Sequence, residues 1–160
     1  MKKLKLNKLL LILLLFSLNV TAQKLDRKAF YEYSENIEFR IFGLTKQRMI
    51  DRGNGYYANN IVAKKGRRFI TIVFEFRNNS SKSQEIDFDK IYIRDTNGEL
   101  HKIDFVVMSM KLTARTNKLQ QKLKAKKKRK IVAQFRPSFD KDELIDELVI
   151  GERIIRLNYN

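Results

Sequence analysis

Residues 67–103 read RRFITIVFEFRNNSSKSQEIDFDKIYIRDTNGELHKI and contain the clearest strand pattern of the chain. Ile70, Ile72, Phe74 and Phe76 fall at every second position of this stretch. Because successive side chains of a strand point to opposite faces of its sheet, the pattern predicts a strand that buries these four residues. The intervening positions are predicted to form a mostly solvated face, and they are Thr71, Val73, Glu75 and Arg77.

Turn-forming residues follow this strand and divide the stretch into shorter strands. Residues 78–83, NNSSKS, bond readily to their own backbone and predict a turn. The alternation resumes over 86–93 and is interrupted at Asp89-Lys90, where we expect a β-bulge. Residues 95–99 contain Asn-Gly, which adopts positive φ at little cost and predicts a hairpin turn.

Similar patterns extend through the rest of the chain. Strands are predicted at 37–43, 131–135, 148–150 and 154–157, while 46–60 reads as a hairpin or a long loop. Residues 30–33 fit either a short helix or a strand, and the conformation of 108–125 stays open between strand and helix. About seven to eight short strands separated by turns predict an all-β fold, an immunoglobulin-like antiparallel β-sandwich.

The first 22 residues have the organisation of a secretory signal peptide. Four lysines precede an apolar run over 9–16, and Val20-Thr21-Ala22 places permitted residues before a cleavage point. The apolar run is shorter than the roughly 20 residues of a spanning helix. We therefore expect export, cleavage after Ala22 and a single domain over 23–160. The chain has no Cys, so we expect neither disulfides nor lipid attachment at a cysteine. The signal peptide predicts that the protein is periplasmic or secreted.

The order of these motifs resembles that of a known family. Gly66, the strand over 69–76, the Asn-Asn-Ser at 78–80 and the Asp-x-x-Gly at 95–98 resemble immunoglobulin-like (telokin-like) domains of bacterial exported proteins and lipoproteins. The resemblance covers roughly 61–157, although Ala125 and a lysine run stand where the family often has Pro-Gly. It implies the fold and an exported location, and it implies no catalytic residues.

Positive charge is the most unusual feature of the sequence. The formal net charge is +16, or about +12 without the four lysines of the signal peptide. Eleven Lys or Arg and no acid occur between Asp104 and Asp140. Such a segment attracts phosphate or sulfate polymers and anionic membrane surfaces, but lysines also protect an exposed edge strand from pairing. Lys64, Lys65, Arg67 and Arg68 would join this segment if their turn lay at the same end of the molecule. The predicted anion-binding residues, from the basic 111–130 stretch, are Lys124, Lys126, Lys127, Lys128, Arg129 and Lys130.

No residue pattern indicates catalysis, a cofactor or a metal. His101, the single histidine, is expected to be exposed just past the hairpin turn. Asp95 to Gly98 resembles a calcium loop but lacks its spacing and its bidentate Glu. Two carboxylate clusters remain, Asp87/Asp89 and Asp140/Asp142/Glu143.

Three functions are compatible with this sequence. The first is an exported, non-enzymatic interaction module for an unidentified protein or envelope component. The second is a binder of polyanions or of the anionic envelope surface that uses the basic stretch, without sequence-specific recognition of nucleic acid. The third is a hydrolase with an unrecognised carboxylate site.

Overall fold

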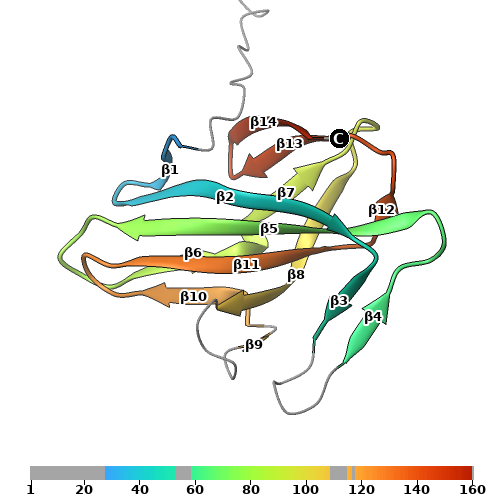
Figure 1. The fold of residues 1–160 in the computed structure, drawn as a ribbon. Coiled ribbons are helices and arrows are strands. Elements are labelled where there is room, and N and C mark those ends of the chain that lie inside the picture. The colour runs from blue at the N-terminus through green and yellow to red at the C-terminus, as the bar shows by residue number, and fades with distance from the viewer. Residues whose placement is uncertain (1–27, 53–58, 109–114, 117, 160) are drawn as a thin grey trace, which may run out of the picture.

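The computed structural model describes residues 28–52, 59–108, 115–116 and 118–159, and these residues form an antiparallel all-β structure. The main sheet has the strand order β1-β2-β5-β11-β8-β7-β13-β14, and Figure 1 shows it folding over itself into two layers. The predicted all-β antiparallel sandwich is therefore confirmed. Its elements are β1 (Tyr31–Ser34), β2 (Ile37–Gln47), β3 (Met49–Asp51), β4 (Asn60–Val62), β5 (Arg67–Asn78), β6 (Gln84–Asp87), the 3₁₀ turn η1 (Phe88–Lys90), β7 (Ile91–Arg94), β8 (Leu100–Met108), β9 (Arg115–Thr116), β10 (Gln120–Leu123), β11 (Lys128–Arg136), β12 (Phe139–Asp140), β13 (Ile145–Ile150) and β14 (Arg153–Tyr159).

β8 joins the two layers. Its first residues pair with β7, in the register Ile93↔His101, and its later residues pair with β11, in the register Ala133↔Val106. β1, β2, β5 and β11 form the layer on one side of β8, and β7, β13 and β14 form the layer on the other side. A small separate sheet of β6 and β10 adds Ile86 and Leu123 to the core between them.

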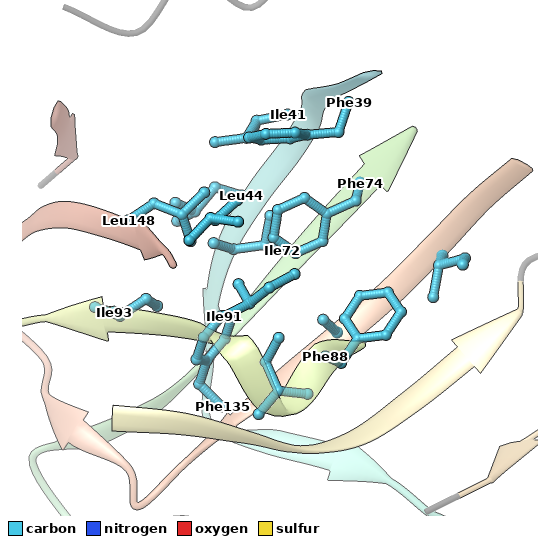
Figure 2. Packing of buried hydrophobic residues seen from close by; sticks show 14 of the residues in the cluster. Phe39, Ile41, Leu44, Ile72, Phe74, Phe88, Ile91, Ile93, Phe135 and Leu148 are labelled. Carbon is cyan, nitrogen blue, oxygen red and sulfur yellow. The ribbon is translucent and has the colours of Figure 1, made fainter. Parts of the chain in front are cut away.

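The core consists of the predicted alternating residues of β5 and their counterparts on the facing layer. Ile70, Ile72, Phe74 and Phe76 are fully buried, as predicted. Figure 2 shows Phe74 and Ile72 from one layer pointing toward Phe88, Ile91 and Leu148 from the other. The ring centroids of Phe74 and Phe88 lie 6.2 Å apart, a contact that joins the layers directly.

The opposite face of β5 is more buried than predicted. Thr71 and Glu75 are 6% and 8% exposed, so the expectation of a mostly solvated face is wrong at these positions. Long side chains from the neighbouring strands cover them. Gln47 donates a hydrogen bond to the Thr71 hydroxyl at 2.9 Å, and Arg40 pairs with Glu75 at 3.1 Å. We refer to this face of β2, β5 and β11 as the outer face.

Several element boundaries also differ from the predictions. β2 continues past Gly43 to Gln47, because a bulge between Ile41 and Gly43 restores its pairing with β5. The interruption at Asp89-Lys90 is a 3₁₀ turn capped by the Asp87 side chain, and no bulge occurs there. Residues 31–34 form the strand β1, so the strand is the correct one of the two conformations predicted for this region. Residues 120–123 of the segment whose conformation was left open form the strand β10.

Residues 46–60 include part of a hairpin, which confirms the first of the two alternatives predicted for them, a hairpin or a long loop. β3 pairs with β4 in the register Ile50↔Ile61, and Ile50 packs with Phe69 and Ala63 in a second small core. Among the described residues, no helix is long and apolar enough to cross a membrane. The predicted signal peptide, the Gly53–Gly55 loop and Lys111 lie outside the described residues.

Candidate anion-binding groove

The groove is organised by Asn78, the last residue of β5, which is 1% exposed. Its side-chain amide donates to the backbone carbonyls of Lys82, Leu123 and Lys124 at 2.8, 3.1 and 3.2 Å. Its side-chain oxygen accepts hydrogen bonds from the backbone N–H and the hydroxyl of Ser80. Asn78 therefore links the turn after β5 (residues 79–83) to the turn between β10 and β11 (residues 124–127), which we call the basic turn.

The basic turn adopts an unusual backbone conformation at Lys126. This residue has φ +56°, in the left-handed region where glycine is favoured. Its backbone N–H donates to the Ser80 carbonyl at 3.2 Å, and its ammonium group donates to the Asn79 carbonyl. The two turns are thus joined through both backbone and side chain.

An open groove of about 560 Å³ lies beside this pair of turns. Its lining contains four cationic side chains and, within the described part of the chain, no carboxylate and no aromatic ring. Arg129 donates to the Lys122 carbonyl at 3.4 Å, so β11 and β10 are linked along the groove. The lining residues are Ser83, Lys122, Lys124, Ala125, Lys127 and Arg129.

The structure divides the six predicted anion-binding residues into separate sets. Lys124, Lys127 and Arg129 line the groove, while Lys126 is held in the turn. In the register of β11 with β5, Lys128 lies opposite Arg77 and Lys130 lies opposite Glu75, so both lysines lie on the outer face. This division follows from strand geometry, because alternate residues of β11 point to opposite sides of the sheet.

The alternative that the basic run protects an exposed edge stays a prediction. Lys128 to Lys130 pair with β5 on one side, but the pairing of β11 with β8 begins only at Ile131. The residues that follow Met108 of β8 lie outside the described part of the chain.

The turn before β5, which contains Lys64 and Lys65, does not line the groove. Lys64 and Lys65 precede Arg67, the first residue of β5, whereas the groove lies beside Asn78, its last residue. Twelve strand residues separate the two ends by about 35 Å. Figure 1 shows the two turns at opposite ends of β5.

His101 is buried at 7% exposure, so the prediction that it is exposed is wrong. Its Nε2 forms a hydrogen bond with Oδ2 of Asp95 at 2.9 Å, and the ring centroids of His101 and Phe139 lie 4.3 Å apart. Asp95 Oδ1 accepts the backbone N–H groups of Asn97 and Glu99 at 2.9 and 2.8 Å. Burial raises the pKa of Asp95, but the hydrogen bonds from His101 and the two backbone groups outweigh it and leave the pKa below its ordinary value of 3.8.

Asp95, Glu99 and His101 place one donor atom each within 4.8 Å, a set that could hold a cation. The Asp95 carboxylate already accepts three hydrogen bonds, which account for its burial without a ligand. We therefore interpret this cluster as structural, because its hydrogen bonds stabilise the β7–β8 hairpin.

The two carboxylate clusters named as hydrolase candidates are also held by local contacts. Gln120 donates to Asp87 at 3.2 Å and to Asp89 at 2.7 Å. Asp140 pairs with Arg67 at 3.0 Å, and Glu143 accepts the Asp140 backbone N–H.

Three polar residues of the groove region lie outside the six predicted anion-binding residues. Lys122 belongs to the basic stretch, and Ser83 belongs to the predicted turn after β5. Asn78 was also assigned to that turn, although an Asn that ends a buried strand is a signal for side-chain bonds to neighbouring backbone.

Comparisons with known proteins support the fold alone. No protein-family model matches the chain, and no curated protein matches it. One similar solved structure is an uncharacterised β-sandwich protein from Clostridium difficile 630, with a TM-score of 0.59 and 10% sequence identity. The match covers 85% of this chain and 94% of that one. At this identity the likeness shows a shared β-sandwich architecture.

Proposed function

We propose that the protein is an exported, non-enzymatic binding module that holds sulfate, phosphate or carboxylate groups of an envelope component in the groove. One observation carries this proposal. Lys122, Lys124, Lys127 and Arg129 line an open groove whose described lining contains no carboxylate. Four clustered cations repel one another, and an anionic ligand would relieve that repulsion.

The location and the family belong to the same proposal. The signal-peptide pattern of residues 1–22 supports export to the periplasm or the medium. The motif order over 61–157 supports a relationship with the immunoglobulin-like (telokin-like) domains of bacterial exported proteins. The non-enzymatic character is supported by the sequence, in which no residue pattern indicates catalysis.

The test is a titration of the purified protein against heparin, inorganic polyphosphate and anionic vesicles at two salt concentrations. Replacing Lys124 and Lys127 by Gln should weaken binding by about tenfold, because each screened surface contact contributes about 0.2–1 kcal/mol. Higher salt should weaken the wild type more than the variant, since the variant has fewer ionic contacts.

A matched control removes the same charge from the opposite end of β5. Lys64 and Lys65 are both exposed, and the Lys64→Gln/Lys65→Gln variant should keep wild-type affinity. Equal weakening by both variants would show a general effect of net charge. No binding by the wild type to any of the three ligands at low salt would also rule out the proposal.

A further inference from the structure

A carboxylate lies beside the groove, on the strand that pairs with β10. In the register of β10 with β6, Lys122 lies opposite Glu85. Directly opposed residues of two paired strands have their side chains on the same face, with Cβ atoms about 5 Å apart. Lys122 lines the groove together with Ser83, which directly precedes β6, whereas Glu85 is outside this lining. Glu85 is therefore an acidic neighbour of a cationic groove.

The opposed charges of Lys122 and Glu85 do not neutralise each other. Both residues are exposed, and within the described part of the chain neither side chain forms an ion pair. Other directly opposed residues of opposite charge do form ion pairs, and these are Arg94–Glu147 at 2.8 Å, Arg40–Glu75 at 3.1 Å and Arg77–Glu38 at 3.4 Å. The Lys122 ammonium group and the Glu85 carboxylate are thus both available to a ligand.

The next carboxylates after Glu85 are held by other groups. Asp87 lies opposite Gln120, whose amide donates to Asp87 at 3.2 Å and to Asp89 at 2.7 Å. Asp87 also pairs with Lys90 at 3.5 Å. Among these three acids, Glu85 is the one that lies opposite a residue of the groove.

This arrangement distinguishes between two kinds of anionic ligand. A phosphate in the groove is attracted by lysines such as Lys122 and Lys124, because lysine ammonium groups bind phosphate as point charges. A ligand with negative groups alone is also repelled by Glu85. If the ligand has an ammonium group a few bonds from its phosphate, the same carboxylate attracts it. One residue can therefore favour one ligand and disfavour the other.

We infer that the ligand of the groove is zwitterionic, with an ammonium group a few bonds from the phosphate that the lysines hold. Phosphoethanolamine is the simplest compound with this chemistry, which also occurs in phosphatidylethanolamine headgroups. The inference rests on the proposed function of the groove. It adds Glu85 as a residue that determines which anionic ligand is preferred.

The test compares phosphoethanolamine with ethyl phosphate, which lacks the ammonium group, in NMR titrations of the purified protein. At pH 8 both phosphates are dianionic, because their second pKa is near 6. The wild type should bind phosphoethanolamine about threefold more tightly, a factor that one screened ionic contact supplies. Glu85→Gln should bind ethyl phosphate at least as tightly as phosphoethanolamine. Because Glu85 is exposed, this substitution should leave the fold intact.

A matched control removes the same charge from the other end of β5. Asp142 is exposed and lies two residues after Asp140, which pairs with Arg67 at the start of β5. Asp142→Asn should keep the wild-type preference. If it lost the preference as Glu85→Gln does, the effect would come from net charge and the inference would be wrong.

Vesicles distinguish the two sources of the zwitterionic group. Cosedimentation with phosphatidylethanolamine vesicles that Glu85→Gln weakens would place the group on a lipid. Binding of free phosphoethanolamine without cosedimentation would place it on a soluble or polymer-borne ligand. Both results agree with the inference, provided that the preference over ethyl phosphate depends on Glu85.

The outcomes also separate this inference from the proposed function. Wild-type binding of ethyl phosphate that equals or exceeds binding of phosphoethanolamine would overturn the inference, and so would a preference that persists in Glu85→Gln. The groove function would stand in either case if polyphosphate bound and Lys124→Gln/Lys127→Gln weakened its binding. No binding of either small phosphate, of polyphosphate, of heparin or of anionic vesicles at low salt would remove both.

Discussion

Lys126 occupies a backbone position that favours glycine. Its φ of +56° costs a non-glycine residue roughly 1 kcal/mol, and its ammonium group bonds to the Asn79 carbonyl. We expect Lys126→Gly to be more stable than Lys126→Ala by about 1 kcal/mol, because both remove the side-chain bond and only Gly removes the strain. Urea unfolding of the two variants measures the difference, and equal stabilities would contradict the assigned conformation.

Asp95 is expected to make the stability of the protein sensitive to acid. Its pKa is lowered in the folded protein, mainly because the hydrogen bonds to its carboxylate outweigh the effect of burial. A lowered pKa means that the contribution of Asp95 is present above its ordinary value of 3.8 and is lost as the pH falls through the lower folded value. The stability difference between wild type and Asp95→Asn should therefore shrink as the pH falls below 3.8.

Denaturant melts at pH 6, 4, 3 and 2 measure this difference. Asp142, which is exposed, provides the control, because Asp142→Asn should differ little from wild type throughout this range. A difference for Asp95→Asn that stays constant down to pH 2 would contradict the assigned hydrogen bonding.

At the scale of single elements, β5 provides a contrast between two buried faces. Phe74 is fully buried between the layers, so Phe74→Ala should lower the free energy of unfolding by about 3–5 kcal/mol. Thr71 is buried on the outer face with one hydrogen bond from Gln47, so Thr71→Ala should cost only about 0.5–1.5 kcal/mol. Urea melts of both variants check the prediction, and equal losses would mean that the assignment of the faces is wrong.

Asn78 joins three segments and positions the basic turn. Replacing it by Ala removes the donor that satisfies three backbone carbonyls, so we expect a loss of about 2–3 kcal/mol in stability. Anion affinity should fall as well, because the turn that holds Lys124 and Lys127 loses its support. Calorimetry and heparin titration on the same variant measure both effects. Unchanged stability would contradict the role of Asn78, and so would unchanged affinity.

The strands were predictable where the hydrophobic alternation was regular. Ile70 to Phe76 and Ile131 to Phe135 were identified because local period-two patterns reflect burial. The burial of Thr71 and Glu75 was not predictable in this way, since it depends on long side chains from β2, far away in the sequence. His101 was placed wrongly for the same reason: Phe139 covers it from a distant strand.

At the scale of the whole molecule, strand order decides which charges act together. The sequence shows the basic residues but does not show that β11 lies between β5 and β8, or that Lys64 and Lys65 lie at the far end of β5. Pairing between distant segments therefore determines the groove. Within the six predicted anion-binding residues, only Lys124, Lys127 and Arg129 line it.

The most direct test of the groove is a heteronuclear NMR titration of the purified protein with a four-sugar heparin fragment. Backbone amide shifts report the location of binding independently of affinity. We expect the largest changes at Ser83, Lys122, Lys124, Lys127 and Arg129, and little change at Lys64 and Lys65. Changes centred on Lys64 and Lys65, or spread evenly over all exposed lysines, would contradict the proposed site.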